Sequence, residues 1–218
     1  LFTMPELVDE LFKLHDKNPS DYFQYKRKEV LCNYFWDDTT FFPAYAKKSD
    51  FIQKAAETFD EPQENLEKYI TSTEEKYALT ADLFLKKSLH KTKNYFSTST
   101  LKAIRSMHKL HLNSTLDQVN QQSFSSPKLI QLFNRYATYN GSSPYQTPGI
   151  MSMIPHLEMN KGTYLPKGGM HQISQSLTRL AEEVEIEFHL GKQVNQIEHN
   201  AKKVTGVQAG EKFYPADL

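Results

Sequence analysis

Few residues of this 218-residue sequence could do chemistry of their own, and most of them lack the partners that a reaction centre needs. His108 and His111 stand on one expected helix, but no carboxylate or third ligand lies nearby, so a solvated basic face is the better interpretation and no metal site is expected. Ser142 and Ser143 lack the G-x-S-x-G elbow, so serine hydrolase chemistry has no support.

Arg135 is the charged residue that most invites a functional interpretation. It stands in the aromatic segment 133–139, and an isolated charge in an apolar site is costly, so a buried Arg135 must be paired. This segment opens the stretch 133–170, which also holds a Gly-Ser-Ser-Pro break, a short apolar run and a Pro-Lys-Gly-Gly loop. Since Gly tolerates positive φ and Pro fixes φ, the backbone here must turn sharply or pass close to something.

Three motifs in this stretch carry a resemblance to a known family. N-R-Y-x-T-Y-x-G-x-S-P-Y-x-T-P begins at Asn134, I-P-x-L-E at Ile154, and G-x-Y-x-P-K-G-G-M at Gly162. In this order they resemble the flavin-dependent carotenoid desaturases of the bacterial and fungal phytoene dehydrogenase type. The likeness extends to L-F-T-M-P-E-L at the start and to residues 190–207, so it covers nearly the whole chain and is specific as a composite.

The resemblance implies an FAD-dependent oxidoreductase that desaturates a long apolar polyene, phytoene or another carotenoid, in a tunnel that aligns it and excludes water. Arg135 would then orient the loop 141–144 or lie near the flavin and stabilise negative charge on the reduced ring. The candidates for the tunnel wall are Tyr136, Tyr139, Tyr145, Ile150, Met151, Met153, Ile154 and Tyr164.

The resemblance also implies cofactor contacts. Val194 matches the family position whose main chain meets the adenine end of FAD. Met4 and Pro5, and likewise Gly168 and Gly169, match segments near the junction of the flavin and the substrate tunnel.

The glycine-rich fingerprint G-x-G-x-x-G, which lets a backbone approach a pyrophosphate, occurs nowhere in the sequence. In the resembled family it lies upstream of the segment matching residues 1–5, and a second flavin-contacting stretch lies beyond position 218. We therefore expect a fragment of a longer polypeptide. FAD would bind to the full-length protein, whereas this fragment without the missing FAD-domain portions would bind it poorly and be inactive.

Composition excludes some classes of partner. Lys plus Arg equals Asp plus Glu, so the basic excess of a nucleic-acid binder is missing. The single Cys32 excludes an intramolecular disulfide and suits a reducing cytoplasm. No apolar run approaches the length needed to span a bilayer. A membrane-dissolved polyene nevertheless implies peripheral membrane contact, for which the segment 69–85 with Lys86 and Lys87 beyond it is the candidate.

The expected fold class is α+β. Residues 1–165 are expected to form a mainly helical substrate-binding domain with an antiparallel sheet (22–45 and 163–165) and helices over 47–158. Residues 166–218 are expected to form a piece of a Rossmann-like FAD domain, with a helix, a strand and a β-meander in that order.

Periodicity and capping residues predict the individual elements. A helix carrying Leu7, Leu11 and Leu14 follows Pro5, and the aromatic residues of 22–45 are expected to line one face of the sheet. The remaining helices are expected over 50–59 with Ser49 as N-cap, from 61 to about 88, over 101–112, over 116–124, and over 127–140 with Ser126 as N-cap. A turn at 168–169, a helix carrying Ile173, Leu177, Leu180 and Val184, and strands over 186–190, 194–199, 204–209 and 212–214 complete the prediction.

Two alternatives stay open. A hydroxycarotenoid desaturase, a carotenoid isomerase or a retinol-saturase-like enzyme would share the tunnel and the motifs. A cofactor-free helical module that binds a hydrophobic ligand or a protein partner would not need the glycine-rich fingerprint at all.

Overall fold

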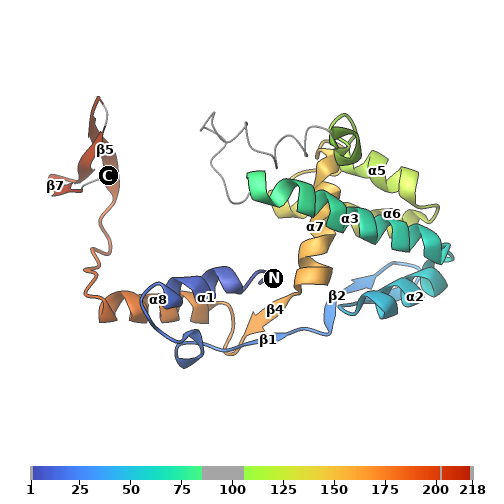
Figure 1. Ribbon diagram of the computed structural model, residues 1–218, viewed down its shortest axis with the longest axis horizontal. Helices are drawn as coiled ribbons and strands as arrows, with labels where there is room; N and C mark the ends of the chain where they lie inside the picture. Colours follow the sequence, from blue (N-terminus) through green and yellow to red (C-terminus); the bar gives the residue numbers. More distant parts are fainter. Residues whose placement is uncertain (1, 85–105, 202, 217–218) are drawn as a thin grey trace. The chain divides into compact units, whose positions relative to one another are not determined.

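The computed structural model describes residues 2–84, 106–201 and 203–216 (Figure 1). The chain forms two compact units, Leu1–Ile173 and Ser174–Leu218. The elements up to the end of the first unit are α1 (Glu6–Lys13), η1 (Pro19–Asp21), β1 (Tyr25–Arg27), β2 (Val30–Phe35), β3 (Phe41–Tyr45), α2 (Lys48–Phe59), α3 (Gln63–Phe84), η3 (Met107–Leu110), α5 (Leu116–Ser123), α6 (Pro127–Asn134), η4 (Arg135–Asn140), η5 (Gly149–Met153), α7 (Ile154–His156), η6 (Leu157–Lys161) and β4 (Tyr164–Pro166). α8 (His171–Glu183) begins at the end of the first unit, and β5 (Val194–Asn200), β6 (Lys203–Ala209) and β7 (Lys212–Pro215) follow it. Mixed α+β structure is confirmed.

Aromatic side chains hold the helical core of the first unit together. Phe133 of α6 packs on Tyr69 of α3, with 4.5 Å between ring centroids, and stacks on Phe124 at 5.0 Å. From α2, Phe51 meets Phe133 edge-on. These rings are all buried, and aromatic pairs in such geometries add to the stability gained from buried area.

The strands of the first unit form two separate antiparallel pairs, so the prediction of a single sheet was wrong. β2 and β3 form a hairpin in which Tyr34 faces Phe42 and Phe35 faces Phe41. β1 pairs with the distant β4, which agrees with the predicted association of 163–165 with 22–45. The aromatic residues do not share one face, because alternation buries Phe42 while Phe35 and Phe41 are exposed.

Several helix boundaries differ from the prediction. α2 begins at Lys48, and the N-cap is Lys47, not Ser49. α3 begins at Gln63, two residues later than expected, and the predicted end near 88 lies outside the described residues. Residues 101–105 of the predicted helix 101–112 also lie outside them, and its described part is the 3₁₀ turn η3, which His111 ends in a left-handed conformation.

The N-terminus of α6 is capped from another part of the chain. Ser126 occupies the predicted N-cap position, but its side chain makes no capping bond. The buried carboxylate of Glu61 accepts the backbone N–H groups of Ser125 and Ser126 at 2.8 and 2.9 Å instead. A carboxylate at a helix N-terminus satisfies unpaired donors and interacts favourably with the helix dipole, so Glu61 connects the turn between α2 and α3 to α6.

The predicted helix 127–140 changes character along its length. α6 ends at Asn134, and the 3₁₀ helix η4 continues to Asn140, where Gly141 ends it with φ of +60°. The later run 149–161 passes through 3₁₀, α and π turns in succession. A π turn inserts an extra residue into a helix and is frequent at functional sites. The segment 149–161 is therefore a candidate part of a functional site.

In the second unit the helix and the meander are confirmed. α8 covers Ile173, Leu177 and Leu180 of the predicted stripe and ends at Glu183, one residue before Val184. The strands order as β5-β6-β7, all antiparallel. The predicted strand 186–190 does not form. Among the described residues no strand pairs with this segment. A sequence with alternating apolar residues forms a strand only where a neighbouring strand accepts and donates its backbone hydrogen bonds.

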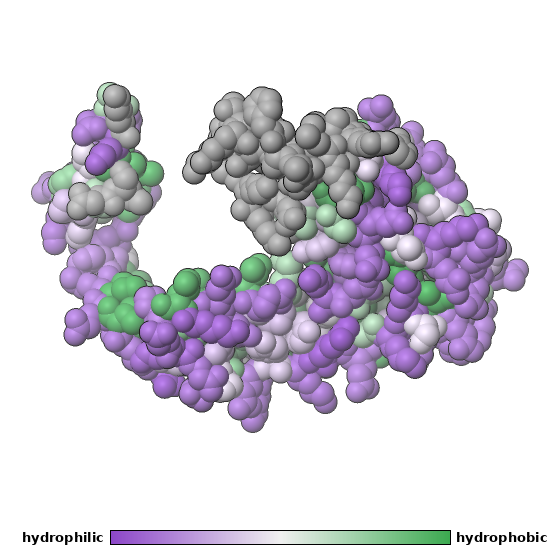
Figure 2. Space-filling view, in the orientation of Figure 1, coloured by the Kyte–Doolittle hydropathy of each residue, from purple (hydrophilic) through white to green (hydrophobic). Residues whose placement is uncertain are grey.

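α1 carries an apolar stripe on its surface. Leu7, Leu11 and Leu14 recur as predicted for a helix, yet all three are exposed, and hydrophobic surface is visible along α1 in Figure 2. No described helix is long and apolar enough to cross a membrane.

Candidate active site

A buried carboxylate organises the centre of the stretch 133–170. Glu158 is 1% exposed, and it accepts hydrogen bonds from Arg135 Nη2 at 2.8 Å, Tyr136 Oη at 3.0 Å and Tyr139 Oη at 2.6 Å. Arg135 Nε also donates to Tyr34 Oη at 2.6 Å, and the guanidinium lies over the Tyr136 ring at 4.4 Å. The side chain of Arg135 is 22% exposed, and the expected pairing with a carboxylate is present.

Protonated tyrosines keep this network together. Burial, and then the neighbouring Glu158 carboxylate, raise the pKa of Tyr136 and Tyr139 above the usual value of a phenol. Burial likewise raises the pKa of Tyr34. Each hydroxyl therefore stays a donor at neutral pH, which makes the network a rigid scaffold and not a source of protons.

The π turn η6 presents Glu158 on one side and binds Arg27 on the other. Arg27 Nη2 donates to the carbonyl oxygen of Met159 at 3.3 Å. A Cβ on Gly162, whose φ is +99°, would lie 2.9 Å from Arg27 Nε. Glycine at this position thus allows the chain to leave η6 and join β1 through β4.

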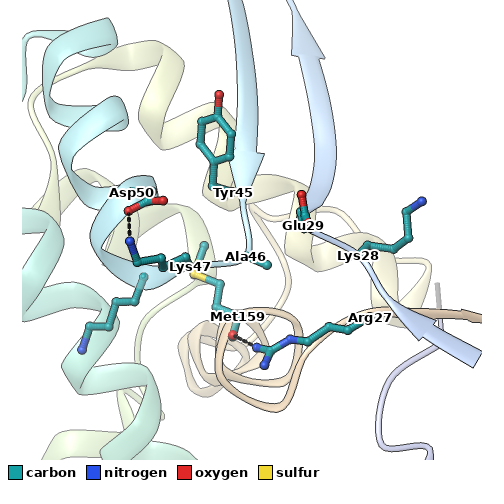
Figure 3. A pocket seen from close by; sticks show the side chains of 9 residues that line it. Arg27, Lys28, Glu29, Tyr45, Ala46, Lys47, Asp50 and Met159 are labelled. Carbon is teal, nitrogen blue, oxygen red and sulfur yellow. Dashed lines mark hydrogen bonds and ion pairs between the residues drawn. The ribbon is translucent and has the colours of Figure 1, made fainter.

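A surface cavity of about 820 Å³ opens at this junction (Figure 3). Its wall includes Arg27, bonded to Met159, and Lys47, which pairs with Asp50 at 2.9 Å. Lys28 points away from the neighbouring Glu29 in Figure 3. None of the predicted substrate residues lines this cavity, so its charged wall is no tunnel for a polyene.

A second cavity, of about 850 Å³, includes two residues singled out by the sequence, Arg135 and Tyr145. Asp117 and Asn134 also line it, and their side chains are joined by a 2.6 Å hydrogen bond. Pro127, Ile130 and Pro144 complete a lining of mixed polarity. Tyr145 is exposed.

A different set of residues lies where α3 meets η5 and α7. Tyr77 stacks on His156, with 4.7 Å between ring centroids, and its Oη lies 3.9 Å from Met4 Sδ. Thr80 Oγ1 lies 3.2 Å from Met153 Sδ. We call these five residues, together with Lys76 and Ser152, the α3 face.

Lys76 is the unusual member of the α3 face. It is 2% exposed, and its Nζ donates to Ser152 Oγ at 2.8 Å. No carboxylate in the described parts of the chain pairs with it. Burial lowers the pKa of Lys76 to about 8 and, as the largest cause, also lowers that of His156. Perturbed titratable groups gathered in one place mark candidate functional sites.

Comparison with known proteins decides the family. The family described as flavin containing amine oxidoreductases matches residues 2–218. The chain belongs to this family. The carotenoid-desaturase resemblance is confirmed as well: the chain is 55% identical over 218 residues to a 1-hydroxycarotenoid 3,4-desaturase of Flavobacterium sp. (strain P99-3). It is 28% identical over 220 residues to a 4,4'-diaponeurosporene oxygenase of Staphylococcus aureus (strain USA300). Both alignments cover 100% of the chain and 44% of the relative, so the chain spans less than half the length of these curated relatives.

The residues predicted for the substrate tunnel of this flavin-containing amine oxidoreductase lie in different environments. Tyr136 and Tyr139 belong to the Glu158 network, and Met153 belongs to the α3 face. Ile154 is in the core, with Met151 packed against it. Ile150, in η5, is half-buried.

The remaining tunnel candidate, Tyr164, lies beside the start of the chain. Its N–H donates to the carbonyl of Phe2 at 2.7 Å, and its ring meets Tyr25 edge-on. Met4, predicted near the flavin, lies on the α3 face and has a φ of +52°, a conformation that is uncommon outside glycine. Pro5 is the N-cap of α1.

The predicted cofactor positions at the later end of the chain are on turns and edges. Gly168 and Gly169 form the turn before α8 with φ of +90° and +93°. Val194 is the exposed first residue of β5.

Sequence reasoning missed Lys76, Ser152 and Glu158 as site residues. Glu158 stood inside the motif I-P-x-L-E, and the rule that a buried Arg135 needs a partner is a signal that could have found it. Lys76 follows Glu74 and Glu75, which makes its helix face resemble a solvated one. Only burial identifies it.

Proposed function

We propose that the full-length protein is a flavin-dependent desaturase acting on a long polyene of the carotenoid class. The observation that carries the proposal is the 55% identity to a 1-hydroxycarotenoid 3,4-desaturase across all 218 residues. Membership of a flavin-containing family supports it. The arrangement of Met4, Tyr77 and Met153 on the α3 face supports it too, because soft sulfur and aromatic groups suit a long apolar chain.

We propose that the flavin is FAD and that these 218 residues form only part of its binding site. Thr163 Oγ1 is one of two buried side-chain atoms without a hydrogen-bond partner among the described residues, the other being Asp9 Oδ1. Thr163 immediately precedes β4, beside the segment Phe2–Met4. An unpaired buried hydroxyl there fits a polar atom of a bound group.

Val194 fits a main-chain contact with the same cofactor. β5 is at the edge of its sheet, so the outward backbone groups of this strand have no ladder partner within the described sheet. The large apolar side chains of Ile197 and Phe213 are exposed in this unit. We propose that the missing portions of a Rossmann-like FAD domain cover them.

When bound, the flavin would accept a hydride equivalent from one C–H bond, while a proton leaves the adjacent carbon and a carbon–carbon double bond forms. This chain would align the substrate and exclude water from the site. Glu158 and its partners fix η4 against η6, and α3 fixes Met153 and His156. Holding the substrate in a fixed orientation can lower the activation barrier of such a reaction by a large amount.

We further propose that the protein works in the cytoplasm at a membrane surface, with the α1 stripe in contact with lipid. Tyr69 and Ile70 of the segment 69–85 are buried in the core, so this segment is a poor lipid contact, and Lys86 and Lys87 lie outside the described residues. Exposed Leu11 is the better probe. Replacing Leu11 with Asn should reduce co-flotation of the full-length protein with lipid vesicles, whereas Glu10→Asn, a change at an exposed neighbour, should not. Equal flotation of both variants would refute the lipid contact.

The proposed function is tested by purifying the full-length protein with and without added FAD, alongside the chain 1–218. We expect flavin absorbance in the full-length protein alone and a more strongly conjugated product from a carotenoid substrate. Isomerised or saturated product would favour the isomerase or saturase alternatives. Absence of flavin even after FAD addition would favour a cofactor-free binding module and overturn the proposal.

A further inference from the structure

The buried face of α3 changes from apolar to polar along the helix. Its first half turns Leu66, Tyr69 and Ile70 into the core, as a core helix should. One turn later the buried positions are Thr73, Lys76 and Thr80. Apolar side chains such as leucine would be the usual residues at buried helix positions. Burying polar groups is costly unless they are used.

The two threonines of this row are satisfied by their own helix. Thr73 Oγ1 donates to the carbonyl of Ile70 at 2.7 Å, and Thr80 Oγ1 donates to the carbonyl of Lys76 at 2.7 Å. Such bonds are the usual way for threonine to sit inside a helix. Thr80 Oγ1 also lies 3.4 Å from the carbonyl oxygen of Tyr77 and 3.2 Å from Met153 Sδ, so both hydroxyls have acceptors within the protein.

Lys76 differs from them because its ammonium has hydrogens to spare. Of three N–H donors, one goes to Ser152 Oγ at 2.8 Å, and the Ser152 hydroxyl in turn donates to the carbonyl of Gly149 at 2.7 Å. The described residues provide no second acceptor for Nζ. In this series of hydrogen bonds Lys76 donates to Ser152, and Ser152 donates to Gly149. Two N–H donors of Lys76 are then left without an acceptor among the described residues, in a residue that is 2% exposed.

We infer that Lys76 and Ser152 form the subsite that recognises a hydroxyl group at the end of the polyene. This rests on the proposed desaturase function. A neutral alcohol oxygen accepts from Nζ while bringing no new charge into a buried site. The sulfurs of Met4 and Met153, which contact the neighbouring Tyr77 and Thr80 of α3, suit the hydrocarbon.

Two further observations fit an alcohol at this place. The name of the relative with 55% identity specifies a hydroxyl on C1 and desaturation at C3–C4, which are close neighbours along a chain, so an anchor for the hydroxyl must lie near the reacting carbons. Lys76 precedes Tyr77 on α3, and Tyr77 Oη lies 3.9 Å from Met4 Sδ. The family resemblance matches Met4 to a segment near the junction of flavin and substrate.

The test compares two polyenes that differ only in the terminal hydroxyl, using flavin-loaded full-length protein. Wild type should favour the hydroxylated polyene in kcat/KM. Lys76→Met, which keeps the length and loses the donors, should lower the ratio of the two kcat/KM values by about 10- to 100-fold, as expected for a hydrogen bond to a charged group. Lys68→Met, an exposed lysine of the same helix, should keep the wild-type ratio.

Each outcome decides something. A wild-type ratio retained by Lys76→Met, or no preference in wild type, overturns the subsite while leaving the desaturase proposal in place. Failure of wild type to desaturate either polyene overturns the desaturase proposal and the subsite with it. If Lys76→Met does not fold, Ser152→Ala replaces it. That variant frees Nζ from its anchor, and the ratio should fall several-fold, whereas an unchanged ratio would again overturn the subsite.

Discussion

Lys76→Met should stabilise the full-length protein at neutral pH, and the gain should disappear in alkali. Burial lowers the pKa of Lys76 from 10.5 to about 8, and each pKa unit corresponds to about 1.4 kcal/mol. The buried ammonium therefore costs the folded state roughly 3 kcal/mol below pH 8. Because the folded-state pKa of a base is depressed, this cost is fully present below pH 8, shrinks as pH rises, and is gone above the unfolded value of 10.5.

Neighbouring charges set the size of this effect. Glu75, beside Lys76 on α3, acts against burial, although it is also paired with Lys109 at 2.9 Å. His111, the titratable group following η3, has its pKa lowered first by burial and then by Lys76. Methionine forfeits the hydrogen bond of the charged ammonium to Ser152, worth about 2 kcal/mol. The net gain at pH 7 should accordingly be about 1 kcal/mol.

Urea unfolding followed by circular dichroism, at several pH values between 7 and 10.5, measures the difference between variant and wild type. Other lysines and tyrosines titrate in both proteins and cancel in that difference. Lys68→Met, at an exposed position on the same helix, should show a difference near zero throughout. A gain for Lys76→Met that does not change with pH, or a loss at pH 7, would refute the reasoning that Lys76 is a buried cation without a carboxylate.

Three other substitutions test the scaffold, each by the same unfolding assay. Glu158→Gln should cost about 2–3 kcal/mol by removing the charged hydrogen bonds of the buried carboxylate and leaving the partly exposed Arg135 without its anion, and a loss below 1 kcal/mol would mean that the network is dispensable. Glu61→Gln should cost about 1–2 kcal/mol because the amide caps α6 poorly, and an unchanged midpoint would show that water caps α6 equally well. Gly149→Ala should cost about 1–3 kcal/mol, since its Cβ would lie 2.8 Å from the carbonyl oxygen of His111; wild-type stability would show that this contact opens freely.

Local patterns in the sequence predicted the elements whose signal is local. The stripe of α8 and the alternation of the meander were read correctly, because their periods of 3.6 and 2 follow from helix and strand geometry. The strand 186–190 shows the limit of that reasoning: Ile186 and Phe188 alternate with polar residues, yet a strand exists only where a partner completes its hydrogen bonds. The grouping of 163–165 with 22–45 agrees with the pairing of β1 with β4, but the sequence did not show that β2 and β3 form a separate pair.

The candidate site was predictable only in part. The need of Arg135 for a partner was predicted, but Glu158 was not named as that partner, although it lay in a motif that had already been singled out. Lys76 was not accessible to the same argument, because lysines amid glutamates on a long helix usually face water. The burial of Thr73 and Thr80 could not be predicted either, because it depends on how α3 packs against η5 and α7.

The central claim is that the full-length protein removes hydrogen from a polyene and passes it to a bound flavin. Adding a hydroxylated carotenoid to the flavin-loaded protein without oxygen tests it most directly, with flavin and polyene absorbance followed together. The account predicts that the flavin band bleaches while the polyene band moves to longer wavelength, in equal molar amounts. A flavin that stays oxidised while the polyene is unchanged would contradict the account.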